Sequence, residues 1–215
     1  MEEKIILLLG PKHSGKTSAA RALAESLRCR CVDLDALIET RTGKKPRALY
    51  REGVEAFRRA EAEALADAMS DAARESLATD PRASASRNAG GGEDVRYTII
   101  STGGGLIDNG GVVSVVKALK PQGNSERSVI LVFLEVSAKT AWNRICRSVK
   151  AGGELPPFLQ TETPEETHRL LHERRNRAYK ELANFTVMAE HKTEKGIAAE
   201  ILQRGGVFAD KTQNI

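Results

Sequence analysis

Five short apolar runs along the chain have the length and composition of buried β-strands. The first, residues 5–9, is continuous and ends at Gly10, which is typical of a central parallel strand buried on both faces. A second run ends at Asp33, and three more cover residues 97–101, 129–134 and 185–189. We expect the first run to lie in the middle of the sheet.

Longer stretches with helical periodicity separate these runs. Apolar residues recur at helical spacing over residues 16–28, 57–72 and 138–149, and in a final helix that ends at Gly205. Another helix begins at Thr163, where threonine, proline and then Glu166 have the pattern of an N-cap with a capping box. Because strands alternate with helices, the sequence predicts an α/β fold with a parallel sheet.

Two segments interrupt this alternation. Residues 79–94 are rich in serine, alanine, glycine and asparagine and have no apolar period, so we expect a flexible surface insertion. Residues 150–163 contain two glycines and two adjacent prolines, which break regular structure and are compatible with a mobile lid. A length of 215 residues suits a single domain over residues 1–215.

The composition narrows the class of function. The chain carries 33 Lys and Arg against 29 Asp and Glu, a net charge of +4 that suits small anionic ligands but is too mild to indicate nucleic acid. The N-terminal apolar run is too short to span a bilayer. The three cysteines have neither the spacing of a zinc site nor that of a C-x-x-C redox pair, which is typical of a protein whose thiols stay reduced. We expect a cytoplasmic monomer with no nucleic-acid or membrane partner.

The strongest chemical signal is a phosphate-binding loop. Residues 10–17 read Gly-Pro-Lys-His-Ser-Gly-Lys-Thr, which matches the P-loop pattern in full, and they lie between the first strand and the first helix. We expect Lys16 to reach the β- and γ-phosphates of ATP and the Thr17 hydroxyl to bind Mg²⁺. The predicted ATP-binding residues of this segment are Gly10, His13, Ser14, Gly15, Lys16, Thr17 and Ser18.

Further candidate side chains follow from their positions. Asp33 and Asp35 stand near the carboxyl edge of the sheet, where one carboxylate can orient Mg²⁺ and the other accept a hydroxyl proton, with plain solvated charge as the alternative. Arg58 and Glu61 are three residues apart on a predicted helix and can touch. Arg175 falls on the inward stripe Leu171, Arg175, Ala178 and Leu182, where a guanidinium needs an anion.

Taken together, these motifs resemble the shikimate kinase family. The matching segments are the P-loop, residues 32–35 with 38–39 and 41–43, residues 53–61, the run Ser101-Thr102-Gly103-Gly104-Gly105, and residues 173–175 with Tyr179. They occur in the order and roughly the spacing of that family, over nearly the whole chain outside residues 79–94. Several linked motifs are much more specific than a P-loop alone.

The resemblance implies a three-layer α/β/α P-loop fold with a five-stranded parallel sheet and a lid. It implies transfer of the ATP γ-phosphoryl group to the 3-hydroxyl of shikimate, with Lys16 and Asp35 as the catalytic residues. Asp33 and Thr17 would lie at the Mg²⁺ site, and Arg147 would pack on adenine. The substrate-binding residues implied are Asp35, Arg58, Gly103, Gly104, Gly105 and Arg175, with Glu61 orienting Arg58 and with Arg174 as the alternative to Arg175.

The lid departs from the family pattern. The family's lid normally carries an arginine before a proline, which closes over the transferring phosphate, whereas residues 155–159 read Leu-Pro-Pro-Phe-Leu. The loss of this lid arginine would slow the reaction by orders of magnitude unless another cation takes its place, and the candidates are Lys12, Arg144, Arg147 and Lys150. Two alternatives therefore stay open: a kinase of the same fold for another hydroxylated acid, and a non-catalytic nucleotide-binding relative.

Overall fold

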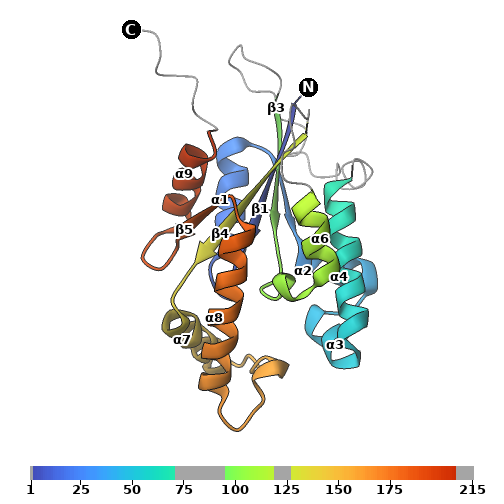
Figure 1. The fold of residues 1–215 in the computed structure, drawn as a ribbon, viewed down its shortest axis with the longest axis vertical. Helices are drawn as coiled ribbons and strands as arrows, with labels where there is room; N and C mark the ends of the chain where they lie inside the picture. The colour runs from blue at the N-terminus through green and yellow to red at the C-terminus, as the bar shows by residue number, and fades with distance from the viewer. Residues whose placement is uncertain (1, 71–94, 119–126, 207–215) are drawn as a thin grey trace.

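The computed structural model of the chain describes residues 2–70, 95–118 and 127–206, and its strands form one parallel sheet (Figure 1). The strand order is β2-β3-β1-β4-β5. The strands are β1 (Glu2–Leu9), β2 (Arg30–Asp33), β3 (Val95–Ser101), β4 (Arg127–Glu135) and β5 (Phe185–Met188). The five predicted strands and the central place of β1 are confirmed, while the predicted insertion at 79–94 lies outside the described residues.

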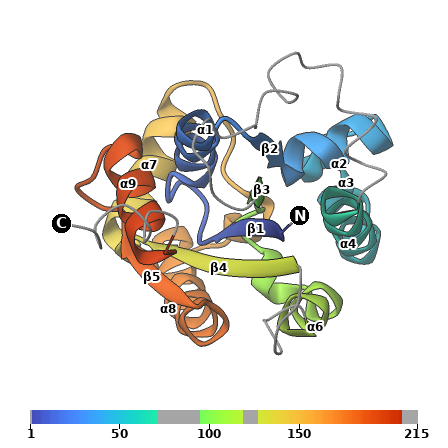
Figure 2. The ribbon, with the colours of Figure 1, turned by 90° about the horizontal axis from the view of Figure 1, so that it is seen from above.

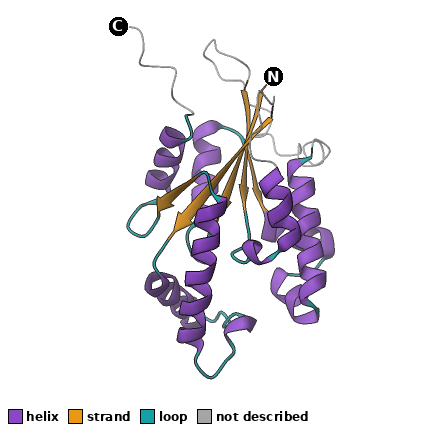
Figure 3. Ribbon diagram, viewed as in Figure 1, coloured by secondary structure: helices purple, strands orange, loops and turns teal. Residues whose placement is uncertain are grey.

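Helices cover both faces of the sheet because β1 is apolar on both of its faces. Ile5, Leu7 and Leu9 pack into one core, whereas Ile6 and Leu8 pack into the other. Figures 2 and 3 show the resulting three layers, as predicted. One core contains α1 (Lys16–Leu27), α7 (Ala138–Lys150) and α9 (Glu194–Arg204); the other contains α4 (Val54–Met69), α6 (Gly110–Ala118) and α8 (Pro164–Leu182).

The region after β2 is more helical than predicted. Two short helices, α2 (Leu34–Thr42) and α3 (Pro46–Glu52), precede α4, which begins before the predicted start at residue 57. Gly43 ends α2 with a φ of 68°, a left-handed conformation that favours glycine. Pro46 opens α3, where its missing N–H costs no helical hydrogen bond. These two helices bring additional side chains to the edge of the site.

The start and the buried face of α8 differ from the predictions. The Thr163 side chain accepts no capping hydrogen bond, and Glu166 pairs with Arg169 at 2.7 Å, so the predicted capping box is wrong. The buried positions of the helix are His168, His172, Tyr179 and Leu182. Of the predicted inward stripe only Leu182 is fully buried; the other three positions are partly buried.

The predicted lid connects α7 to α8 and folds back on the protein. It contains one short 3-10 helix, η2 (Pro157–Leu159), whose Leu159 is fully buried. Glu154 is held by two arginines of α3: Arg47 Nη2 donates to its backbone oxygen at 2.8 Å, and Arg51 Nη2 lies 2.6 Å from its Oε2. The lid therefore contacts α3. Within the described ranges, no helix is long and apolar enough to cross a bilayer.

Candidate active site

The P-loop turns sharply between β1 and α1 at the carboxyl edge of the sheet. Gly10 and Gly15 have φ values of +144° and +95°, which side chains beyond glycine rarely adopt. A Cβ on Gly10 would also lie 2.7 Å from the backbone oxygen of Leu134 in β4. The loop therefore needs glycine at both positions, and it presents the N-terminus of α1 to the space above.

A cavity opens over this loop. Five of the predicted ATP-binding residues line it, namely His13, Gly15, Lys16, Thr17 and Ser18. Gly10 and Ser14 lie buried behind it. Arg147 is exposed on α7 and does not line it, so its contact with adenine stays a prediction. Arg144, one turn earlier, does line it and donates from Nη1 to the backbone oxygen of His13 at 2.7 Å.

Lys16 lies at the base of this cavity. Its Nζ donates to the backbone oxygen of Pro11 at 2.8 Å and to Ser14 Oγ at 3.4 Å. Burial lowers the pKa of Lys16 to about 8, while Asp35 and Asp33 oppose that change. A polyphosphate above the loop would supply the counter-charge that restores the ordinary pKa of this ammonium group.

Oxygen ligands suitable for Mg²⁺ meet at the edge of the same cavity. Thr17 Oγ1 donates to Asp33 Oδ2 at 2.8 Å and lies 3.3 Å from Ser101 Oγ. Asp33 Oδ1 accepts from the backbone N–H of Asp35 at 3.0 Å, which fixes the carboxylate. The described residues contain no group of three or more His, Cys, Asp or Glu that could hold a metal. One carboxylate and one hydroxyl suit Mg²⁺, which is commonly held together with substrate phosphates.

Asp35 stands in the first turn of α2, where it lines two cavities. Burial is the largest cause that raises the pKa of its carboxyl, followed by the nearby charge of Asp33. Lys16 and Lys12 act in the opposite direction. A carboxylate whose pKa is raised in this way is a better proton acceptor than one in water, which suits a general base.

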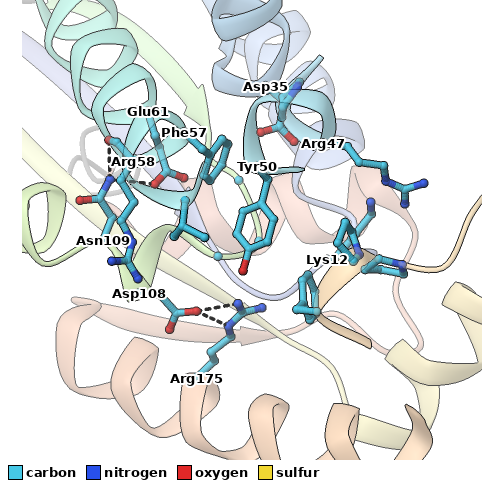
Figure 4. A pocket seen from close by; sticks show the side chains of 18 residues that line it. Lys12, Asp35, Arg47, Tyr50, Phe57, Arg58, Glu61, Asp108, Asn109 and Arg175 are labelled. Atoms are coloured by element: carbon cyan, nitrogen blue, oxygen red, sulfur yellow. Dashed lines mark hydrogen bonds and ion pairs between the residues drawn. The ribbon is translucent and has the colours of Figure 1, made fainter. Parts of the chain in front are cut away.

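The second cavity lies between α3, α4, α8 and the lid, and Figure 4 shows the side chains that line it. All of the predicted acceptor-site residues line it, namely Asp35, Arg58, Glu61, Gly103, Gly104, Gly105 and Arg175. The remaining lining residues are Lys12, Pro46, Arg47, Tyr50, Val54, Phe57, Asp108, Asn109, Pro156, Pro157 and Phe158. The structure therefore brings together residues as far apart in the sequence as Lys12 and Arg175.

Arg175 is the arginine of α8 that faces this cavity. Its Nε and Nη2 donate to Asp108 Oδ2 at 3.0 and 2.6 Å, and its guanidinium lies 5.1 Å from the centre of the Phe158 ring. Arg174 also binds Asp108, through Oδ1 at 2.7 Å, but its side chain is 63% exposed and does not line the cavity. The anion expected beside Arg175 is thus Asp108, and the geometry favours Arg175 over Arg174.

The structure does not pair Glu61 with Arg58 as predicted. Arg58 Nη1 lies 2.9 Å from Glu55 Oε1, while Glu61 Oε2 accepts from Asn109 Nδ2 at 3.1 Å. Asn109 Nδ2 also donates to the backbone oxygen of Arg58 at 2.8 Å, so the link between the two residues passes through Asn109. Residues three positions apart on a helix can touch on either side, and here the Arg58 guanidinium pairs with Glu55, on the solvent side, instead of Glu61.

Glu61 is itself an unusual group. Its side chain is 1% exposed and its Oε1 has no hydrogen-bond partner. Burial raises the pKa of Glu61 from 4.5 to about 7; Asp35 adds to this effect, whereas the hydrogen bond from Asn109 opposes it. The carboxyl therefore changes charge near neutral pH.

The glycine run after β3 separates the two cavities. A Cβ on Gly104 would lie 2.5 Å from the backbone nitrogen of Lys12, so the two main chains are in contact. A Cβ on Gly103 would lie 3.1 Å from Asp35 Oδ1. Close approach of the Lys12 main chain therefore requires glycine at position 104, whereas a Cβ at position 103 would only press on the end of the Asp35 side chain. The predicted contact of this backbone with a substrate ring stays a prediction.

Some lining residues were missed by the sequence reasoning. Asp108 and Asn109 follow the glycine run within four positions, at the edge of the sheet where ligands bind, and this position was the available signal. Arg47 lies on α3, a helix too short to give a periodic pattern. Phe158 lies in the predicted lid, but no contact of its side chain with the cavity was predicted.

Comparison with known proteins identifies the family. The model of the family described as shikimate kinase matches residues 12–79 and 93–205. A shikimate kinase from Vibrio parahaemolyticus is 28% identical over 203 residues, which cover 94% of this chain and 96% of that protein. One from Actinobacillus pleuropneumoniae is 28% identical over 206 residues, with 94% and 95% covered. A solved structure of shikimate kinase from Acinetobacter baumannii in complex with shikimate aligns with a TM-score of 0.67 at 25% identity, covering 97% of this chain and 95% of that chain. The chain therefore belongs to the shikimate kinase family.

Proposed function

We propose that this protein is a shikimate kinase that transfers the γ-phosphoryl group of ATP to the 3-hydroxyl of shikimate, with Mg²⁺ as cofactor. The observation that carries this proposal is the meeting of two cavities at Asp35, one built on the P-loop and the other containing Arg175. A donor in the first cavity and an acceptor in the second would face each other across this carboxylate. Membership of the family supports the same two substrates.

The reaction needs few groups from the protein. The acceptor oxygen forms a bond to the γ-phosphorus while the bond from phosphorus to the β,γ-bridging oxygen breaks, and the electron pair leaves with ADP. Asp35 accepts the hydroxyl proton, and Lys16 binds the phosphate oxygens. Thr17 and Asp33 would hold Mg²⁺, which when bound neutralises phosphate charge. The protein's main contribution is to position the two substrates.

Arg175 binds the carboxylate of shikimate in this proposal. Its Nε and Nη2 both donate to Asp108 Oδ2, and this same edge of the guanidinium has the geometry that binds carboxylates. The carboxylate of shikimate would compete with Asp108 or share the guanidinium with it. Arg58 is available on another side of the cavity, because its pair with Glu55 is exposed and such pairs are weak.

The test of this role is Arg175→Lys. Lysine keeps the charge but loses the fork, so we expect the KM for shikimate to rise, by roughly 10- to 100-fold for the loss of a charged hydrogen bond worth about 1.5–3 kcal/mol. The KM for ATP should stay unchanged. Arg174→Lys is the matched control, since Arg174 lies outside the cavity. Normal shikimate binding by Arg175→Lys would refute the clamp.

A kinase for another hydroxylated acid is the second candidate. It is favoured by Asp108, which already neutralises Arg175, and by a lid with Pro156 and Phe158 against the acceptor cavity. Coupled ADP release measured over a panel of hydroxylated carboxylic acids separates the two candidates. A kcat/KM for shikimate well above that for every other acid supports the first candidate, and the reverse supports the second.

We also propose that the reaction takes place in the cytoplasm. Cys29, Cys31 and Cys146 are free thiols in the structure, and thiols persist where the environment is reducing. A mass measurement of the protein taken directly from cells, after alkylation, should find all three modified; an oxidised pair would contradict this location.

A further inference from the structure

Lys12 occupies a special place between the two cavities. Only three residues line both of them in the described part of the chain: Lys12, Asp35 and Gly104. The junction thus contains one carboxylate, one ammonium group and a glycine without a side chain. The phosphoryl group must pass through this junction if the donor and the acceptor bind on either side of it.

The main chain of Lys12 is fixed, whereas its ammonium group is free. A Cβ on Gly104 would lie 2.5 Å from Lys12 N and 3.0 Å from Lys12 Cα, so the glycine run packs directly on this residue. Over the described ranges, Lys12 Nζ makes no hydrogen bond or ion pair. Figure 4 shows Lys12 on the side of the acceptor cavity opposite Arg58 and Glu61. A positioned cation without a partner is ready to bind an anion.

The other cations around the two cavities are already engaged. Lys16 binds the backbone of Pro11, and Arg144 binds the backbone of His13. The three arginines of the acceptor cavity each have an acidic partner: Arg47 with Glu154, Arg58 with Glu55, and Arg175 with Asp108. Residues 151–163 of the lid contain neither lysine nor arginine. The one cation of the predicted lid, Lys150 at its first position, lines neither cavity, so the lid brings no cation to the junction.

We propose that Lys12 is a further catalytic residue, whose ammonium group binds the equatorial oxygens of the phosphoryl group while it moves from ATP to the acceptor. This proposal rests on the proposed kinase function. Negative charge on those oxygens must be balanced during transfer, and a fixed cation in a closed site does this without reorganisation. Lys12 neither gives nor takes a proton: the hydroxyl proton goes to Asp35 and the bridging electron pair leaves with ADP.

The neighbouring charges are consistent with this role. Burial is the main cause that lowers the pKa of Lys12, and Arg47 acts in the same direction, while Asp35 opposes both. The protein alone therefore supplies this ammonium group with little negative charge. The γ-phosphate of ATP provides that charge, so nucleotide binding and full protonation of Lys12 favour each other.

The test compares Lys12→Met, Lys12→Arg and the control Lys150→Met. Lys150 is exposed at the end of α7, where the predicted lid begins, and lines neither cavity. We expect Lys12→Met to lower kcat by about 10²- to 10³-fold, as for the loss of one group that stabilises a transition state, with the KM of both substrates little changed. Lys12→Arg should recover part of kcat because it keeps the charge. Lys150→Met should behave as wild type.

The slow hydrolysis of ATP in the absence of an acceptor provides a second readout. Water then replaces the hydroxyl, but the charge on the moving phosphoryl group is the same, so Lys12→Met should lower this rate as well. If wild type hydrolyses ATP without phosphorylating shikimate, the proposed function fails while hydrolysis still tests Lys12. A Lys12→Met protein with wild-type kcat, or one in which only the KM for ATP rises, would overturn the catalytic role. A wild type with neither activity would overturn both proposals.

Discussion

The buried carboxyl of Glu61 should make the stability of this protein depend on pH near neutrality. Its pKa is raised from 4.5 to about 7 in the folded state, so the folded protein holds a proton that the unfolded chain has already lost. The stability contributed by this group is thus full below pH 4.5 and is lost as the pH rises through 7. A pKa difference of one corresponds to about 1.4 kcal/mol, which gives a total loss of about 3 kcal/mol.

The substitution Glu61→Gln removes the titrating group and keeps the shape of the side chain. We expect the free energy of unfolding of wild type to fall, relative to the variant, by about 2 kcal/mol between pH 5 and pH 7. Urea unfolding of both proteins at both pH values measures this difference. Subtracting the variant from wild type removes the contributions of the titratable groups that the two proteins share. Glu63→Gln, an exposed position on the same helix, is the control and should follow wild type. If Glu61→Gln shows the same pH dependence as wild type, Glu61 ionises as it does in water and the reasoning from its burial is wrong.

Two further substitutions test the packing around the site. Gly104→Ala places a Cβ 2.5 Å from Lys12 N and should lower stability by about 1–3 kcal/mol and kcat/KM by at least about tenfold, whereas Gly110→Ala, with open space around its Cβ, should behave as wild type; equal behaviour of the two alanines would contradict the contact. Glu154→Gln weakens the contact of the lid with its two arginine partners on α3 and should speed limited proteolysis within residues 151–163. Glu162→Gln, exposed and unpaired in the same segment, is the control, and equal cleavage rates would show that Glu154 does not hold the lid.

The sheet and its helices were predictable because their signals are local. Residues 5–9 are apolar at every position since β1 is covered on both faces, and the P-loop requires glycine for reasons of backbone conformation. The same holds for Asp33, which is the last residue of β2, and for Asp35, two positions after it. A pattern over a few neighbouring residues is enough in each case.

The parts that the sequence did not reveal depend on partners far along the chain. His172 is buried on α8 because its Nε2 lies 2.9 Å from the backbone oxygen of Val136, a contact over 36 residues, so a polar residue takes an inward position that periodicity assigns to apolar ones. Arg175 likewise gains Asp108, and Glu61 gains Asn109 in place of Arg58. Which polar side chain is paired with which is decided only when the strands and helices are assembled.

The most direct test of the account is the identity of the product. Wild-type protein incubated with ATP, Mg²⁺ and shikimate should give a single phosphomonoester in the ³¹P spectrum, coupled to the proton on carbon 3 of shikimate, with one ADP released for each. An ester on another hydroxyl would contradict the placement of the acceptor beside Asp35. No ester from shikimate, together with phosphorylation of a different hydroxylated acid, would contradict the proposed substrate.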